Sequence, residues 1–318
     1  MTGLSHFFSP DKKVYTGTME IRQLGSGTYS DCFKVKDGGG RALAVKLSYY
    51  RAAEHAGGNH DAVCVAAAIA QVARTMRDHR VSPHIVEVFT EADVRGLPLQ
   101  LAPLLPARLA KLTPRQIAVS HVCLMELCSC TLTTFVARSA LATDRVMRCL
   151  IFQVVYTLAC LQKILPGFRH NDLSTNNVLI KKPPGPATTR YVVGGRTFCT
   201  DNMPVAAVLT DFDFTHVPGH AVLSNERIVG ERYGISNDAN EGYDVHLFLK
   251  SLSKCLTRRS AAPLTRAFLA GLGLEAHSRP ANRAPHLDPM RVLGNAYFEP
   301  LASSAGSTAV TASFAMPS

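Results

Sequence analysis

Two polar motifs in the middle of the chain combine proton-accepting and metal-binding side chains. In the first, Asp172 follows His170 by two residues, and Asn177 lies five residues further on, directly before the apolar run 178–180. In the second, a short apolar segment ends at Asp211. A carboxylate on a loop can receive a hydroxyl proton, and carboxylate and amide oxygens are ligands that Mg²⁺ accepts. This spacing suits phosphoryl transfer, with Asp172 as the proton acceptor and with Asn177 and Asp211 as metal ligands.

A glycine-containing turn near the start of the chain could contact phosphate. Residues 19–24 and 31–36 alternate between apolar and polar side chains as strands do, and Gly25-Ser26-Gly27-Thr28 lies between them. Glycine lets backbone N–H groups approach phosphate oxygens because no Cβ intervenes. Lys46 stands on a third predicted strand, 41–47, whose apolar residues favour a buried partner for the ammonium group. A plain turn and a surface lysine are the simpler interpretations of these two features taken alone.

The elements that would position these residues follow from the periodicity of the sequence. An apolar stripe at helical spacing predicts a helix over 61–80. A stronger stripe runs through 144–165 and predicts a core helix rather than a binding face. The other predicted elements are strands at 122–128, 178–180 and 208–210, a helix capped by Thr131, and helices at 243–249, 262–274 and 289–301.

Composition predicts a globular protein of the cell interior. The chain has 318 residues, of which 47% are hydrophobic, and a net charge of +10 without a dense Lys/Arg block. That charge favours acidic partners such as nucleotide, phosphoprotein or nucleic acid, or it is simply a solvated basic surface. The nine cysteines lack zinc spacing, which favours free thiols in a reducing compartment. We expect no signal peptide and no membrane span, because no apolar run reaches ~18 residues.

Taken together, the motifs resemble those of eukaryotic-type protein kinases. His170-Asn171-Asp172 followed by Asn177 resembles the catalytic loop, and Asp211-Phe212-Asp213 resembles the metal-binding motif. Ala44-Val45-Lys46 resembles the strand that carries the ATP-binding lysine. The combination is similar to the divergent Ser/Thr protein kinases of large DNA viruses, over roughly residues 19–300.

Several positions depart from the kinase pattern. Asn171 stands where most kinases have arginine, and Asp213 replaces the glycine of Asp-Phe-Gly. Ser174 occupies the place of a lysine that Ser/Thr kinases hold near the γ-phosphate. The predicted helix 61–80 offers no glutamate to pair with Lys46. The candidates that remain are Glu54, Asp61 and Gln71 as partners of Lys46, and Lys181 and Lys182 as replacements for the missing lysine.

The resemblance implies an α+β, bilobal protein-kinase-like fold with a small β-rich N-lobe and a mostly helical C-lobe. It implies a lead-in at 1–18, an N-lobe at 19–128 with an insertion near 91–118, and a C-lobe at 129–301. The Ser/Ala/Thr-rich composition of 302–318 predicts a disordered tail.

Roles for individual residues follow from the same resemblance, with ATP and Mg²⁺ as cofactors. Asp172 would orient the acceptor hydroxyl and take its proton, Lys46 would orient the α- and β-phosphates, and Asn177 and Asp211 would hold magnesium. Asp244 would anchor the backbone of the catalytic loop from below. The residues implied to contact the nucleotide are Gly25, Ser26, Gly27, Thr28, Cys32, Ala44, Lys46, Met125, Glu126 and Cys128.

The implied function is transfer of the γ-phosphate of ATP to protein hydroxyls, with Ser/Thr as the favoured acceptors. A small-molecule kinase of the choline or aminoglycoside type and a pseudokinase scaffold are the alternatives. Glu126 directly after Met125, the 33-residue interval from Asp211 to Asp244, and the lack of tryptophan favour a protein kinase. We expect protein substrates, no membrane partner, no nucleic acid substrate, and an intracellular location (host cytoplasm or nucleus if the protein is viral).

Three further segments carry expectations about partners and regulation. The proline-containing segments 91–118 and 181–196 predict surface loops, which either recruit acidic partners or are merely solvated. For the second segment, an extended surface hairpin and a flexible loop are both possible. Segment 215–240 resembles a substrate-facing activation segment that offers Thr215, Ser224 and Ser236 for phosphorylation. Because Asn171 has no charge for a phosphate to neutralise, we expect activity without that phosphorylation.

Overall fold

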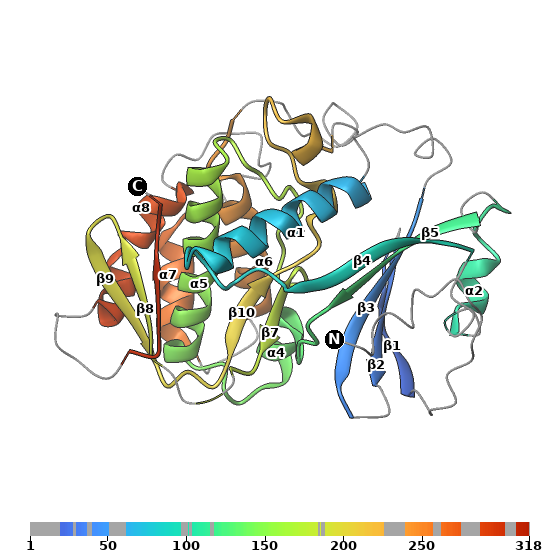
Figure 1. Cartoon of the computed structure of the whole chain (residues 1–318). Helices are drawn as coiled ribbons and strands as arrows, with labels where there is room; N and C mark the ends of the chain where they lie inside the picture. The colour runs from blue at the N-terminus through green and yellow to red at the C-terminus, as the bar shows by residue number, and fades with distance from the viewer. Residues whose placement is uncertain are drawn as a thin grey trace. The chain divides into compact units, whose positions relative to one another are not determined.

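The computed structural model is a mixed α/β protein in which strands dominate the N-terminal part and helices follow (Figure 1). It describes residues 20–27, 30–36, 40–50, 62–96, 101, 104–114, 118–183, 185, 188–225, 239–256, 262–274, 287–302 and 310–317. The chain forms two compact units, one made of residues 1–63 and 87–127 and the other of 64–86 and 128–318. Residues 64–86 join the second unit because the apolar face of their helix packs into its core.

The first unit contains a five-stranded antiparallel sheet in the order β1-β2-β3-β5-β4. Alternate side chains such as Phe33, Val45 and Leu124 are buried on one face, as the strand periodicity predicted. The bounds of the strands are Glu20–Ser26 (β1), Ser30–Lys36 (β2), Ala42–Tyr49 (β3), Val88–Arg95 (β4) and Val119–Met125 (β5).

The predicted insertion 91–118 is in part a structural element of this unit. Its first five residues are the second half of β4 and pair with β5. Further along, Leu101 and Leu105 are 0% and 2% exposed and pack into the core of the first unit, before the short helix α2 (Pro106–Leu109). The expectation of a surface loop was therefore wrong for these residues, because apolar side chains between the prolines cover the sheet.

The second unit is built around helix α5 (Asp144–Ile164), whose side chains are buried almost all round. By length and composition α5 could cross a membrane, whereas we expected no segment of the chain to be long and apolar enough. However, 78% of its 18-residue apolar stretch is buried inside the protein, as in the core helix of a globular domain. The remaining elements are α1 (Ala62–Asp78), β6 (Cys130–Thr131), α4 (Leu132–Arg138), β7 (Val178–Lys181), β8 (Thr188–Val193), β9 (Arg196–Asp201), β10 (Ala206–Leu209), η3 (Phe212–Phe214), η4 (Ala221–Leu223), α6 (Tyr243–Leu256), α7 (Pro263–Gly271), α8 (Pro289–Leu293), η8 (Ala296–Leu301) and β11 (Ala312–Ala315).

Local signals placed several of these helices correctly. The Thr131 side chain accepts a hydrogen bond from the backbone N–H of Thr134 and caps α4 as predicted. The single closing helix expected at 289–301 is instead two short pieces, α8 and η8. The chain breaks at Gly294 because Asn295 starts a new turn, in which its side chain accepts from the N–H of Tyr297.

Segment 181–196, for which we expected an extended surface hairpin or a flexible loop, forms a hairpin with residues 197–201, but the inward-facing side chains of this hairpin are buried. Strands β8 and β9 pair antiparallel, and Tyr191 and Phe198 are 0% and 2% exposed. The far edge of β8 pairs in parallel with β11, so residues 310–317 are ordered, contrary to the disordered tail that composition predicted. Phe314 in β11 is half-buried and stacks on Tyr191, with 6.1 Å between ring centroids. Apolar burial, rather than linker composition, decides both corrections.

A buried polar network ties this hairpin to β10. The Tyr191 hydroxyl lies 2.8 Å from Nε2 of His84, whose Nδ1 lies 2.8 Å from the carbonyl oxygen of Ala207 in β10. The Ala207 N–H in turn donates to the Gln153 side chain on α5. The backbone carbonyl oxygen of His84 accepts a hydrogen bond from the backbone N–H of Leu209, also in β10. His84 thus holds the strand that leads directly to Asp211.

Folding stability should decrease in mild acid because His84 stays neutral in the folded protein. Burial lowers the pKa of His84 from 6.5 to about 3, with Lys181 adding to the effect. Below pH 6.5 the unfolded chain binds a proton that the folded chain excludes, so the free energy of unfolding should fall by up to about 1.4 kcal/mol per pH unit between pH 6 and 4. Urea unfolding at several pH values measures this slope. His84→Gln is the control, and an equal slope in that variant would assign the effect to other groups.

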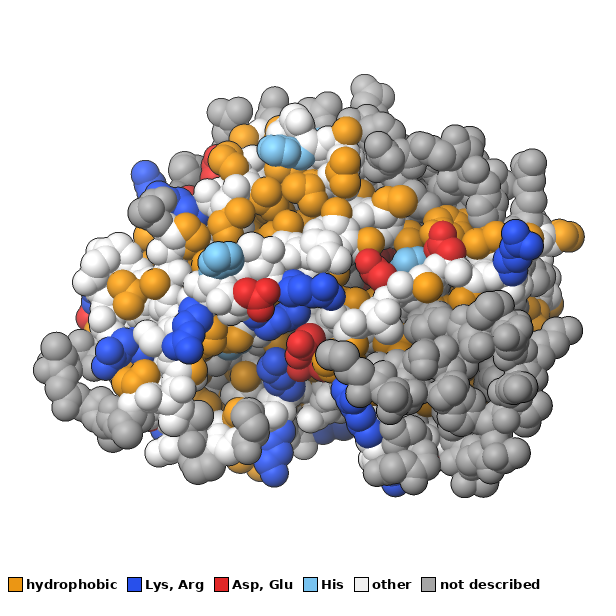
Figure 2. All heavy atoms as spheres, viewed as in Figure 1, with side chains coloured by type: hydrophobic (Ala, Val, Ile, Leu, Met, Phe, Trp, Pro, Cys, Tyr) orange, Lys and Arg blue, Asp and Glu red, His pale blue; other side chains and the backbone are white. Residues whose placement is uncertain are grey.

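Charged side chains are mixed on the surface. Figure 2 shows lysine and arginine side chains scattered among acidic and apolar ones on the face in view, rather than gathered in one basic patch. None of the nine cysteines, all of which lie within the described residues, forms a disulfide bond.

Candidate active site

The loop that carries Asp172 is anchored from below by Asp244. This carboxylate lies on α6, is 1% exposed, and accepts the backbone N–H groups of His170 at 2.7 Å and Asn171 at 2.9 Å. Burial raises the pKa of Asp244, while the two N–H donors and nearby cationic groups favour its charged form. The anchoring role predicted for Asp244 is confirmed by these contacts.

The second half of the loop is held by hydroxyl groups. Thr175 is 1% exposed, and its backbone N–H donates to the Ser251 side chain on α6 at 3.1 Å. Its own hydroxyl lies 2.7 Å from that of Thr133 on α4. Two helices therefore fix the backbone on both sides of Asp172, which gives this loop a defined shape without regular secondary structure.

Asp172 and Asn177 are in direct contact. The Asn177 side-chain amide donates to the Asp172 backbone carbonyl at 2.7 Å and to its carboxylate at 2.9 Å. Burial raises the pKa of Asp172, and the nearby Asp211 carboxylate raises it further, against the opposing effects of His170 and Asn177. The structure therefore brings Asp172, Asn177 and Asp211 together within the second unit.

Asp211 is positioned by the ladder between β7 and β10. Val178 pairs with Leu209, and the N–H of Thr210 donates to the carbonyl oxygen of Asn177 at 3.1 Å, so the two strand ends lie side by side. Asp211 itself has φ 65° and ψ 59°, a left-handed conformation that aspartate tolerates better than most residues. Such local strain is often found at functional sites.

The donor set at this position fits a hard divalent cation. Asp211 and Asn177 offer oxygen atoms, which Mg²⁺ prefers. A cation would also relieve the repulsion between the carboxylates of Asp172 and Asp211 that raises the pKa of Asp172. Among the described residues, no group of three or more His, Cys, Asp or Glu side chains could hold a metal by itself. Any ion here would therefore need water or phosphate oxygens as well.

Asn171, at the position where most kinases have arginine, holds the loop by hydrogen bonding rather than by charge. Its φ is 65°, which asparagine adopts more readily than most residues, and its side-chain amide donates to the Phe214 carbonyl oxygen at 2.9 Å. This bond joins the catalytic loop to the segment after Asp211 without using a charge. The expectation that asparagine would hydrogen-bond nearby backbone is confirmed.

Lys181 and Lys182, the two candidates to replace the kinase lysine missing at position 174, both lie away from Asp172 and Asp211. Lys181 pairs with Ala206, at the opposite end of β7 and β10 from Val178 and Leu209. Three residues of strand span about 10 Å. Lys182 lies one residue further on and is exposed.

In the first unit, four predicted nucleotide-binding residues lie on one face of the sheet. Residues directly opposite in an antiparallel pair, and residues two apart in a strand, share a face. Cys32 is opposite Lys46, Met125 is opposite Ala44, and Ala44 and Lys46 are two residues apart. Ala44 and Met125 are buried, and Lys46 and Cys32 are half-buried.

Sequence reasoning missed an acidic residue on this same face. Lys46 on β3 is opposite Cys123 on β5, and Cys123 is in turn opposite Glu91 on β4, so Glu91 lies on the same face of the sheet as Lys46. The Glu91 carboxylate lies 3.6 Å from Nε2 of His121. The period-two pattern of 88–95 could have revealed Glu91, but the prolines that follow suggested a loop. Among the earlier candidates for the partner of Lys46, Gln71 is exposed on α1, and Glu54 and Asp61 lie outside the described residues.

The glycine turn and the segment after β5 complete the predicted set. Gly25 and Ser26 end β1, and the N–H of Gly27 donates to the carbonyl oxygen of Ser30 at 2.8 Å. A Cβ added at Gly25 would meet nothing within 4 Å, and Thr28 lies outside the described residues. After β5, Glu126 exchanges two hydrogen bonds with the backbone of Glu87, and Cys128 begins the longer segment of the second unit, 128–318.

Parts of the chain are similar in sequence to kinases of two groups of large DNA viruses, the poxviruses and a mimivirus. Residues 121–265 match the model of the poxvirus serine/threonine protein kinase family. A stretch of 110 residues is 33% identical to a protein of Acanthamoeba polyphaga mimivirus that is named as an inferred serine/threonine-protein kinase. That alignment covers 32% of this chain and 23% of the mimivirus protein. Through the segment that carries Asp172, Asn177 and Asp211, this chain resembles the divergent serine/threonine protein kinases of large DNA viruses.

Proposed function

We propose that this protein is an ATP-dependent protein kinase with a bilobal kinase fold, which phosphorylates Ser/Thr hydroxyls of protein substrates inside the cell. The observation that carries this proposal is the hydrogen-bonded pair of Asp172 and Asn177 beside Asp211, on a loop anchored by Asp244. The match to the poxvirus kinase family spans all of these residues and supports the protein kinase class. Nine cysteines without a disulfide bond support a reducing compartment, the cytoplasm or nucleus of a host if the protein is viral.

Asp172 would orient the acceptor hydroxyl and take its proton. Its raised pKa makes it a better proton acceptor than an exposed aspartate, and the Asn177 amide fixes the direction of its carboxylate. A loose phosphoryl-transfer transition state requires positioning more than a strong base, which suits a carboxylate held in this way.

The remaining residues would bind the cofactor. When bound, Mg²⁺ with ATP supplies the phosphoryl group and neutralises developing charge. Asn177 and Asp211 would hold the ion, Lys46 and the Gly25–Gly27 backbone would contact the phosphates, and the chain after Met125 would contact the adenine. The partner of Lys46 is open, with Glu54, Asp61 and Gln71 as the candidates.

Turnover of ATP with a panel of substrates tests this function. We expect phosphate transfer to proteins in the presence of Mg²⁺, no transfer to choline or aminoglycosides, and none with Asp172→Asn. Transfer to the small molecules alone would replace the protein kinase by a small-molecule kinase. Nucleotide binding without any transfer would make the protein a pseudokinase scaffold.

We expect the protein to be active without phosphorylation of its activation segment. Asn171 carries no charge for a phosphate to neutralise, and Thr215 and Ser224 are 0% and 2% exposed, so neither is presented to another kinase. Ser236, the third predicted acceptor, lies outside the described residues. Activity after phosphatase treatment, with removal of phosphate verified by mass spectrometry, should stay within a few-fold of a mock-treated sample. A hundred-fold loss would contradict constitutive activity.

A further inference from the structure

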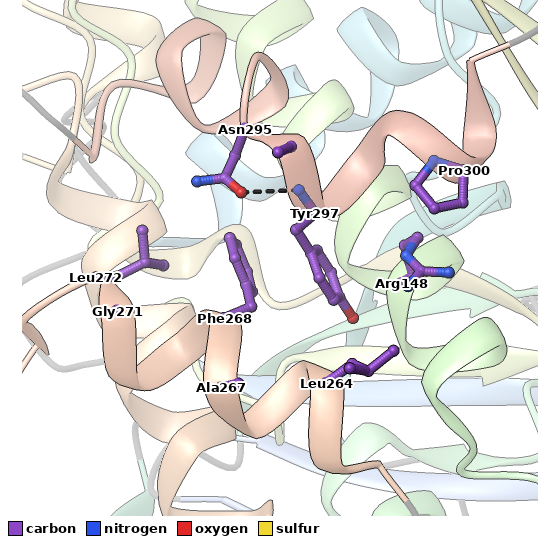
Figure 3. Close-up of a pocket in the computed structure, with 10 residues that line it drawn as sticks. Arg148, Leu264, Ala267, Phe268, Gly271, Leu272, Asn295, Tyr297 and Pro300 are labelled. Atoms are coloured by element: carbon purple, nitrogen blue, oxygen red, sulfur yellow. Dashed lines mark hydrogen bonds between the residues drawn. The ribbon is translucent and has the colours of Figure 1, made fainter.

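An open cavity of about 420 Å³ lies on the second unit, between α7, η8 and the start of α5 (Figure 3). None of the residues that form the proposed catalytic site belongs to it. Its lining is mainly apolar and consists of Arg148, Leu264, Ala267, Phe268, Gly271, Leu272, Asn295, Ala296, Tyr297 and Pro300.

One wall of the cavity is rigid and preformed. The rings of Phe268 and Tyr297 stack with centroids 4.2 Å apart and planes 8° from parallel. The Tyr297 hydroxyl lies 2.8 Å from the Thr265 side chain, which fixes the direction of the ring. A ligand would therefore meet an aromatic surface that needs no ordering upon binding.

The helix beside this wall exposes an apolar face. Leu264 is 58% exposed, and Ala267 and Gly271, three and seven residues later on α7, are also exposed and line the cavity. Three such positions follow one face of a helix for about 10 Å. Exposed apolar residues beside a hollow are typical of surfaces that bind a protein segment.

The charge of the cavity is positive. Among the described residues that line the cavity, Arg148 alone is charged. Its guanidinium lies 5.0 Å from the Tyr297 ring centroid, and its buried Nε has no hydrogen-bond partner. The carboxylates of Asp144 on α5 and Glu299 in η8, two elements that border the cavity, already have hydrogen-bond partners. Asp144 accepts from the backbone N–H groups of Leu264 and Thr265 and from the Thr265 hydroxyl, and both carboxylate oxygens of Glu299 accept from Nη2 of Arg196. A carboxylate from a ligand would complement Arg148.

We propose that this cavity docks an extended or helical segment of a partner protein that places an apolar side chain against Leu264 and Phe268 and a carboxylate on Arg148. In view of the proposed function, on which this inference rests, the partner is a protein substrate held at a site separate from the catalytic loop. A single arginine is too little positive charge for a nucleic acid or a membrane surface.

Binding of synthetic peptides tests the proposal without requiring catalysis. The probe is an array of fluorescein-labelled dodecapeptides that carry Leu, Met or Phe one to four residues from Glu, with twins that carry Lys in place of Glu. We expect acidic peptides to bind with Kd values in the micromolar range and at least ten-fold more tightly than their lysine twins. Equal binding of the two sets, or no binding of either, overturns the proposal.

Variants on exposed positions locate the site. Ala267→Glu should weaken binding of the acidic peptides at least ten-fold, whereas Ala270→Glu, on the same helix but outside the lining, should not. Arg148→Glu should reverse the preference toward the lysine twins, and thermal melting confirms that each variant is folded. Equal effects of the two alanine variants would overturn the assignment. Phosphoryl transfer without peptide binding would refute only the docking site, and peptide binding without transfer would refute only the kinase function.

Discussion

Replacing Asp211 with asparagine is expected to abolish Mg²⁺-dependent phosphoryl transfer while leaving the protein folded. Asparagine has nearly the same shape and tolerates the left-handed backbone at this position, but it lacks the charge that would hold a cation. Removal of one preorganised electrostatic contact from such a site typically lowers the rate on the order of 10²–10³-fold. The measurement is initial-rate transfer from labelled ATP over a range of Mg²⁺ concentrations, with thermal unfolding recorded on the same samples.

Asp213→Asn provides the matched control. It removes an equal charge two residues away in η3, at a position that we do not assign to the metal site. We expect its activity to stay within a few-fold of the wild type. Loss of the thermal transition in Asp211→Asn would make Asp211 a structural residue, and unchanged turnover in that variant would exclude it as a metal ligand.

Deleting residues 183–196 is expected to unfold the second unit, although the sequence suggested a dispensable surface loop. The deletion removes Tyr191, whose ring lies 5.3 Å from that of Phe152 and 5.0 Å from that of Tyr156. Loss of one buried aromatic side chain costs about 3–5 kcal/mol, against a total stability of about 5–15 kcal/mol for a typical domain. The deletion also removes the strand on which β11 pairs and leaves the Nε2 of His84 without its partner.

A graded series of point variants separates these contributions. Tyr191→Phe removes only the hydroxyl and should cost about 1–3 kcal/mol, whereas Tyr191→Ala should cost about 3–5 kcal/mol. Arg196→Ala is the control in the same hairpin, because its side chain is 47% exposed and its ion pair with Glu299 is worth about 0–1 kcal/mol. Urea unfolding is measured for the wild type, the deletion variant and the three point variants. A deletion variant that unfolds like the wild type would mean that the hairpin is not part of the core.

The sequence alone predicted features in which residues close along the chain determine the outcome. The five-residue spacing between Asp172 and Asn177 is bridged by one side chain, and the capping of α4 by Thr131 involves residues three apart. The apolar period of α5 likewise lies within a single segment. Asp244 is distant from the catalytic loop, and its anchoring contact was predicted from a resemblance to kinases rather than from local pattern.

Only the tertiary structure decided which polar or weakly patterned segments are buried. Strand β11 pairs with β8, which lies more than a hundred residues earlier in the chain. Its Ser/Ala/Thr-rich sequence is typical of a disordered tail, but the stacking of Phe314 on Tyr191 and the pairing with β8 order it. His84 joins β8 and β10 through hydrogen bonds that no local spacing indicates. Long-range pairing and burial depend on which surfaces meet after the chain has folded, and that information is spread over distant segments rather than written in any one of them.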